Sequence, residues 1–250
     1  LWFLWHFTSL TEITFKVLPS PEENHTLAVH NLSLERAIDL LEASISSSND
    51  VSGAVFLPSN SGNTECVMNV DKTLKFNDLK YGAPFIAIRL EGSKDSVDER
   101  TKNLINELKL ENENMSILEK IQSTIFWKKI KNLELFNSTK NYILRAVIPP
   151  ANCTELIYQL QNKNLKYYID WGGALIWIES YGLSEEMFYS IRKKVVKLGG
   201  YITLIKSSSN PNLIEDIFTI TKDKFYISQN IKKSFDPKRI LNPGKMYTGI

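Results

Sequence analysis

The 250-residue sequence is poor in cysteine and histidine, with two of the first and three of the second. Cys66 and Cys153 stand alone, and we expect two structural thiols because neither has the spacing of a redox pair or a metal site. Sparse cysteine of this kind is typical of a reducing cytoplasm. His25 and His30 lie in or beside one predicted strand on opposite faces, so we expect no metal site.

The sequence also lacks an excess of charge of one sign and a long apolar run. Its 30 basic and 28 acidic residues leave a net charge of +2, which argues against a nucleic-acid partner because such proteins present a concentrated basic surface. No stretch approaches the roughly 20 apolar residues of a membrane span. The apolar opening, residues 1–7, is too short and lacks the flanks of a signal peptide. We expect a cytoplasmic protein whose association with the inner membrane, if any, runs through partners.

What the sequence does contain is an alternation of strand-like and helix-like segments, interrupted by a polar, irregular excursion over residues 59–83. Strands are predicted over residues 10–18, 26–32, 53–57, 84–90, 142–148, 166–170, 174–179 and 201–206. Helices are predicted over 34–47, 94–108, 116–136, 152–162, 185–198 and 222–234, several of them opened by a serine cap. This order predicts an α+β fold in which two ferredoxin-like units form one antiparallel sheet flanked by helices.

The most specific segment is the run from Phe235 to Tyr247, which contains Asp236-Pro237 and then Asn242-Pro243-Gly244-Lys245. Two prolines and a glycine fix a rigid, turned segment after a helix, and the plain interpretation is a helix stop with a surface turn. The whole run nevertheless resembles the C-terminal signature of the FAD-linked oxidases of the vanillyl-alcohol oxidase superfamily. In that family the segment returns to the FAD domain close to the flavin, which implies that Asn242, Pro243, Gly244 and Lys245 contact the cofactor.

Further segments resemble one branch of that family, the FAD-binding E-type subunits of glycolate oxidases. Residues 10–19 look like the last strand of the FAD-binding domain, and Arg89, Arg145 and the run 169–175 look like inner segments of the E-type subunit. In that run Trp171-Gly172-Gly173 makes a tight hairpin. Two interpretations stay open: Trp171 and Trp177 pack in the core, or Asp170 and Trp171 face the flavin or a partner subunit.

The resemblance implies FAD as cofactor, a 2-hydroxy acid such as glycolate as substrate, and two partners, a catalytic D-type flavoprotein subunit and an iron–sulfur subunit. Trp171, Gly172 and Gly173 join the tail residues as candidate cofactor contacts, while Asp170, Arg89 and Arg145 are catalytic candidates. The D-type subunit carries a histidine-rich loop at the position of this hairpin. Because those imidazoles are absent here, the E-type chain lacks the usual base for a proton transfer.

The resemblance also predicts three parts: residues 1–21 as a remnant of the FAD-binding domain, 22–234 as an α+β cap domain, and 235–250 as the returning segment. Residues 1–9 depart from the family, which has glycines where Trp2 and Trp5 stand. Tryptophan has the single codon TGG, so a frame one base later turns both into glycine at the family's spacing. We therefore expect a frameshift, which accounts for the near absence of the FAD-binding domain and its phosphate-cradling loops.

Two other functions stay open. The chain is either a non-catalytic assembly module that packs on the D-type subunit without holding flavin, or another FAD-linked oxidase that acts on a different hydroxy acid or a lactone. The missing acid–base constellation favours the first alternative, and the Trp171-Gly172-Gly173 hairpin favours the E-type interpretation over the second.

Overall fold

The structure, a computed structural model, describes residues 11–17, 19–58, 83–136, 141–207, 216–244 and 247. Its strands are β1 (Glu23–His30), β2 (Val51–Leu57), β3 (Phe85–Gly92), β4 (Met115–Leu118), β5 (Tyr142–Val147), β6 (Lys166–Asp170), β7 (Leu175–Ser180) and β8 (Tyr201–Lys206). The α-helices are α2 (Leu34–Ser46), α3 (Lys94–Glu107), α4 (Lys120–Lys131), α5 (Cys153–Asn162), α6 (Glu185–Lys197) and α7 (Lys222–Phe235). Two short 3-10 turns are η1 (Pro150–Asn152) and η2 (Trp171–Gly173). Within these ranges, no helix is both long and apolar enough to cross a bilayer.

The strands form one antiparallel sheet in the order β4-β1-β3-β2-β6-β7-β5-β8. Each half has the order strand, helix, two strands, helix, strand along the chain, and the same pairing pattern in space, which is the ferredoxin-like arrangement. The halves join edge to edge where Phe56 of β2 pairs with Ile169 of β6. The predicted α+β fold of two such units in one sheet is confirmed.

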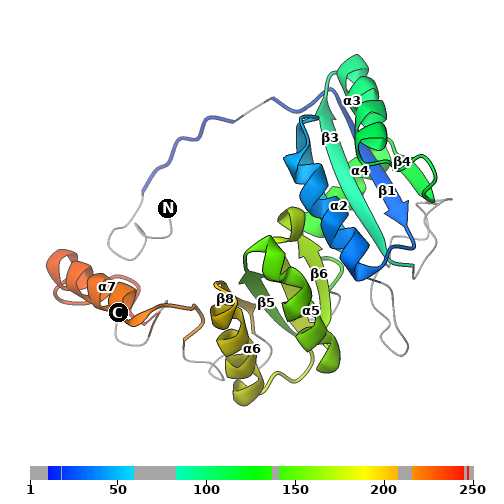
Figure 1. The fold of residues 1–250 in the computed structure, drawn as a ribbon. Coiled ribbons are helices and arrows are strands. Elements are labelled where there is room, and N and C mark those ends of the chain that lie inside the picture. Colours follow the sequence, from blue (N-terminus) through cyan, green and yellow to red (C-terminus); the bar gives the residue numbers. More distant parts are fainter. Residues whose placement is uncertain are drawn as a thin grey trace.

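Helices α2, α3, α5 and α6 cover one face of the sheet, with α2 and α3 on the first half and α5 and α6 on the second (Figure 1). The main core lies in this layer because each helix turns an apolar stripe toward the sheet. In α2 the stripe is Ala37, Ile38, Leu40 and Leu41, and Ser33 caps the helix by accepting a hydrogen bond from the Arg36 N–H. Packing against this helical layer fixes the positions of the strands.

The other face is covered differently in the two halves. Helix α4 packs on β1, and its Phe126 and Ile130 form a second, smaller core with residues of β1, β2 and β3. This core extends to Ile143 of β5 and Tyr168 of β6 through Leu135 and Phe136, which follow the helix. Over β5, β7 and β8 no helix of the described ranges packs on this face. We call this part of the sheet the open face.

Two predicted elements were wrong. The helix expected over 116–136 begins only at Lys120, because Met115–Leu118 pair with β1 as the edge strand β4. The strand expected over 10–18 is absent from the described residues 11–17, where Ile13, Phe15 and Val17 are exposed and no strand pairs with them. Alternation alone does not make a strand without a neighbour to complete its hydrogen bonds. Ser93 precedes α3 without the expected side-chain cap, and the excursion over 59–83, with Cys66, lies almost wholly outside the described residues.

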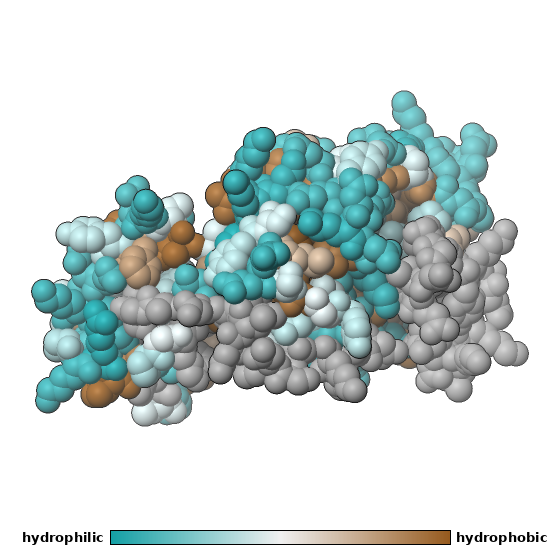
Figure 2. Space-filling model, turned by 90° about the horizontal axis from the view of Figure 1, so that it is seen from below, coloured by the Kyte–Doolittle hydropathy of each residue, from teal (hydrophilic) through white to brown (hydrophobic). Residues whose placement is uncertain are grey.

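Helix α7 and the C-terminal segment lie apart from the sheet (Figure 1). Lys232 is the one residue of α7 that is buried. Tyr226, Ile227 and Phe235 are 65%, 56% and 71% exposed, and Figure 2 shows apolar side chains among polar ones at this end of the molecule. The helix therefore presents apolar side chains to its surroundings.

Candidate functional site

The hairpin between β6 and β7 is the best-defined candidate site. Its three turn residues all have positive φ: 51° for Trp171, 61° for Gly172 and 97° for Gly173. A Cβ on Gly172 would lie 2.6 Å from Cγ1 of Ile45 in α2, so only glycine fits both this conformation and this contact. The turn is thereby pressed onto α2, and Trp171 points the other way, with 56% of its surface exposed.

Asp170 opens the turn with a carboxylate that is half-buried. Its Oδ1 accepts a hydrogen bond from the Trp171 N–H at 2.8 Å, and the side chain of Trp177 donates another. Burial raises the pKa of Asp170 above its usual value, against the opposing pull of these two donors and of the Arg89 charge. The carboxylate is thus shifted toward holding a proton while its position is fixed by hydrogen bonds.

The two candidate arginines differ in their surroundings. Arg89 donates from Nε to Ser52 Oγ at 3.0 Å, pairs with Glu91 at 3.3 Å, and lies 4.8 Å from the centre of the Trp127 ring. Arg145 lies 5.0 Å from the centre of the Trp171 ring and has no ion pair within the described part of the chain. Arg89 is therefore held in place by its neighbours, and its charge also acts on Asp170, whereas the charge of Arg145 has no such partner among the described residues.

These groups share one side of the sheet. Arg145 pairs in register with Trp177, and Trp177 with Tyr168, whose neighbour two residues on is Asp170. Residues two apart in a strand point to the same face. Asp170, Arg145 and Trp177 therefore point to the same side of the sheet, at and beside the open face, and Trp171 lies next to Arg145. We call these four residues the open-face cluster.

The tail residues are placed elsewhere. The Asp236 carboxylate accepts hydrogen bonds from the Ile240 N–H at 3.1 Å and the Leu241 N–H at 2.9 Å, and it pairs with the buried Lys232 ammonium at 2.9 Å. Desolvation pushes the pKa of Asp236 up, but Lys232 and the two N–H groups together hold it below its usual value. Asp236 thus shapes the segment that carries Asn242 and Gly244.

That segment ends in an exposed turn. Asn242 and Gly244 have φ of 46° and 66°, and a Cβ on Gly244 would meet nothing within 4 Å. Lys245 lies outside the described residues. The tail and the hairpin are not brought together in this chain (Figure 1). A role of Asn242, Pro243 and Gly244 toward a cofactor stays a prediction.

Two residues that surround Arg89 were not predicted from the sequence. Trp127, from α4, lies over Gly53 with its ring 3.1 Å from where a Cβ would be, and its Nε1 donates to Thr26 Oγ1 at 2.8 Å. Ser52, which precedes Gly53 on β2, accepts a hydrogen bond from Arg89. The sole local signal was the glycine of β2, which makes room for the indole, and nothing in the sequence pointed from it to a residue so far along the chain.

Residues 219–246 match a family model, described as FAD linked oxidases, C-terminal domain. Over 242 residues the chain is 26% identical to glycolate oxidase subunit GlcE of Escherichia coli strain K12, an alignment that covers 96% of this chain and 54% of that protein. The chain thus spans about half the length of this relative.

Solved structures give the same fold. The chain resembles p-cresol methylhydroxylase with substrate bound, with 14% identity and a TM-score of 0.57 over 91% of this chain and 53% of that one. It also resembles 4-ethylphenol oxidase from Gulosibacter chungangensis, with 12% identity and a TM-score of 0.56 over 93% of this chain and 55% of that one. The predicted resemblance to the FAD-linked oxidases, and within them to the E-type subunit of glycolate oxidase, is confirmed.

Proposed function

We propose, from this resemblance, that the chain is part of the FAD-binding subunit of a glycolate oxidase. The subunit takes part in oxidising glycolate or a related 2-hydroxy acid to the 2-oxo acid, together with a D-type flavoprotein subunit and an iron–sulfur subunit. Likeness to GlcE along nearly the whole chain supports this function. The observation that carries it is the open-face cluster, in which the available Arg145 cation lies over the exposed indole of Trp171 and the preceding Asp170 carboxylate has a raised pKa.

The open-face cluster fits the ring system of a flavin. Trp171 offers an exposed aromatic surface against which a flat heterocycle stacks, and the Arg145 guanidinium beside it suits the negative charge that a reduced flavin carries. When bound, the flavin supplies the redox chemistry, and the chain supplies orientation and electrostatics. The fit concerns the ring alone, because the phosphate-cradling loops expected of the FAD-binding domain are not in this sequence.

Arg145 and Asp170 also suit a small hydroxy acid. A guanidinium with no ion-pair partner among the described residues binds a carboxylate through two parallel hydrogen bonds. Asp170, whose pKa is raised, is a candidate to hold the proton that leaves a hydroxyl group. Its two hydrogen-bond donors stabilise the ionised form, so it is a weaker base than a histidine would be. We therefore expect the D-type subunit to contribute the principal base.

An assembly module is the second candidate, and a specific observation favours it. The exposed Tyr226, Ile227 and Phe235 of α7, with Ile240 beyond it, present apolar side chains that suit a protein partner. On this account the chain binds another subunit, and the open-face cluster has no role in turnover.

One experiment separates the two candidates. The chain is co-expressed with the D-type and iron–sulfur subunits, purified through a tag of its own, and assayed for glycolate-dependent dye reduction. We expect co-purification, turnover by the complex and none by the chain alone, and a loss of about 100-fold in kcat/KM for Arg145→Met, a magnitude typical of losing a charged pair to substrate. An Arg145→Met complex as active as wild type would favour the assembly module, and failure to co-purify would refute both.

A further inference from the structure

A polar cavity lies at the other end of the β6–β7 hairpin from the Trp171 turn. It has a volume of about 550 Å³ and is lined by Asn141, Lys163, Asn164, Leu165, Lys166, Glu179, Ser180, Tyr181 and Met187. Glu179 lies four residues along β7 from Leu175, the partner of Asp170, which corresponds to roughly 13 Å of strand. This volume falls within the range typical of small-molecule sites.

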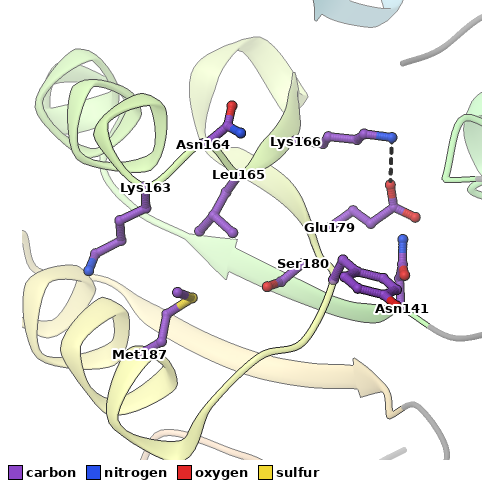
Figure 3. Close-up of a pocket in the computed structure, with 9 residues that line it drawn as sticks. Asn141, Lys163, Asn164, Leu165, Lys166, Glu179, Ser180 and Met187 are labelled. Carbon is purple, nitrogen blue, oxygen red and sulfur yellow. Dashed lines mark ion pairs between the residues drawn. The ribbon is translucent and has the colours of Figure 1, made fainter. Parts of the chain in front are cut away.

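One end of the cavity holds buried acceptors that lack a donor. The Glu179 and Asn141 residues are 3% and 6% exposed, yet Glu179 Oε1 and Asn141 Oδ1 have no hydrogen-bond partner in the described part of the chain. Glu179 Oε2 faces the Lys166 ammonium at 3.8 Å, beyond hydrogen-bond distance (Figure 3). Buried acceptors are costly when unsatisfied, so a donor that reaches both oxygens would bind favourably here.

The opposite end of the cavity carries a positive charge in place of buried acceptors. In Figure 3, Lys163 lies on the far side of the cavity from Glu179, and the apolar Leu165 and Met187 lie between the two. Lys163 has no ion pair within the described residues, so its ammonium is available to an anion. The cavity therefore runs from an acceptor end through an apolar floor to a cationic end.

We propose that this cavity binds a small zwitterion, with an ammonium group at Glu179 and Asn141, a short hydrocarbon part over Leu165 and Met187, and a carboxylate at Lys163. An ammonium carries three donors and a charge opposite to that of Glu179, and hydrogen bonds between ionised groups are stronger than neutral ones. A metal ion fits less well, because no group of three or more potential ligand residues occurs among the described residues. The proposal is independent of the function proposed above, since it uses none of the open-face cluster.

The test is calorimetric titration of the whole chain with three probes: 6-aminohexanoate, hexylamine and hexanoate. We expect 6-aminohexanoate to bind most tightly. Glu179→Gln, which keeps the shape of the side chain, should weaken 6-aminohexanoate and hexylamine at least tenfold. Lys163→Met should weaken 6-aminohexanoate but leave hexylamine unchanged, and Lys193→Met, an exposed lysine of α6 outside the cavity, should change neither.

Several results would overturn the proposal. They are no binding of 6-aminohexanoate at millimolar concentration, hexanoate binding as tightly as 6-aminohexanoate, or equal affinities in wild type and Glu179→Gln. Thermal unfolding of each variant checks that it is folded. Should Glu179→Gln fail to fold, Asn141→Leu removes the second acceptor at nearly constant volume, and the same tenfold loss of the two amine probes is expected of it.

Discussion

The two halves of the sheet share one topology and differ in what lies on their second face. In the first half α4 covers the strands, Trp127 fills the space above Gly53, and Arg89 is held by Ser52 and Glu91. In the second half no described helix covers the open face, Arg145 has no described ion pair, and Asp170 has a raised pKa. The same framework is therefore closed by packing in one half and leaves chemically available groups in the other.

Gly172 gives the largest expected change in the free energy of unfolding, because it holds the β6–β7 turn against α2. Gly172→Ala should destabilise the chain by about 3 kcal/mol, since the methyl group meets Ile45 and the residue keeps a positive φ. Gly182→Ala is the matched control: it also has a positive φ, of 70°, but open space around it, so about 1 kcal/mol is expected. Denaturant unfolding measures both, and equal losses would show that the contact with α2 carries no weight.

Two tryptophans, one in each half, sharpen the comparison between the halves. Trp127→Ala removes a half-buried indole that packs on Gly53 and donates to Thr26, so a loss of about 3 kcal/mol is expected. Trp171→Ala removes a side chain that is 56% exposed, and less than about 0.5 kcal/mol is expected. The free energies of unfolding of the two variants decide this, and a Trp171 variant as destabilised as the Trp127 variant would make both residues structural.

The carboxylate of Asp170 gives the smallest effect, and its sign follows from the pKa. Because the folded pKa is raised, folding favours the protonated form, so the stabilisation is present below the unfolded pKa of about 3.9 and is lost as pH rises through the folded value. Asp170→Asn, which stays neutral, should not show this decline. The test is to measure the free energy of unfolding of both proteins from about pH 3 to about pH 8, a range that brackets the ordinary and the raised pKa of an aspartate. If the free energies of the two proteins changed in parallel with pH, the raised pKa would be contradicted.

Local signals in the sequence predicted much of the fold. The hairpin was evident from Trp171-Gly172-Gly173, and α6 was marked by Ser184, which does accept a hydrogen bond from the Met187 N–H. Strand β4 was missed because a four-residue segment followed by a helical pattern reads as part of that helix, and its pairing with β1 is a contact across the chain. Periodicity does not report such contacts.

The site was predictable in part, for the same reason. Residue types and their resemblance to a family pointed to Asp170, Trp171 and both arginines. Arg89 differs from Arg145 because it contacts Ser52, Glu91 and Trp127, and Trp127 comes from a helix that lies far along the chain from Arg89. The pKa of Asp170 likewise depends on burial and on Trp177, and neither is visible along the chain.

The central claim is that the open-face cluster, and not the closed half, accepts a flavin ring. The most direct measurement is the quenching of lumiflavin fluorescence by the chain, because lumiflavin has the ring of FAD without its phosphates. We expect saturable quenching that Trp171→Ala and Arg145→Met each weaken at least tenfold, as removal of a stacked aromatic or a charged contact does. Trp127→Ala, if folded, should quench as wild type does. Quenching that is unchanged in the Trp171 and Arg145 variants, or lost in the Trp127 variant alone, would contradict the claim.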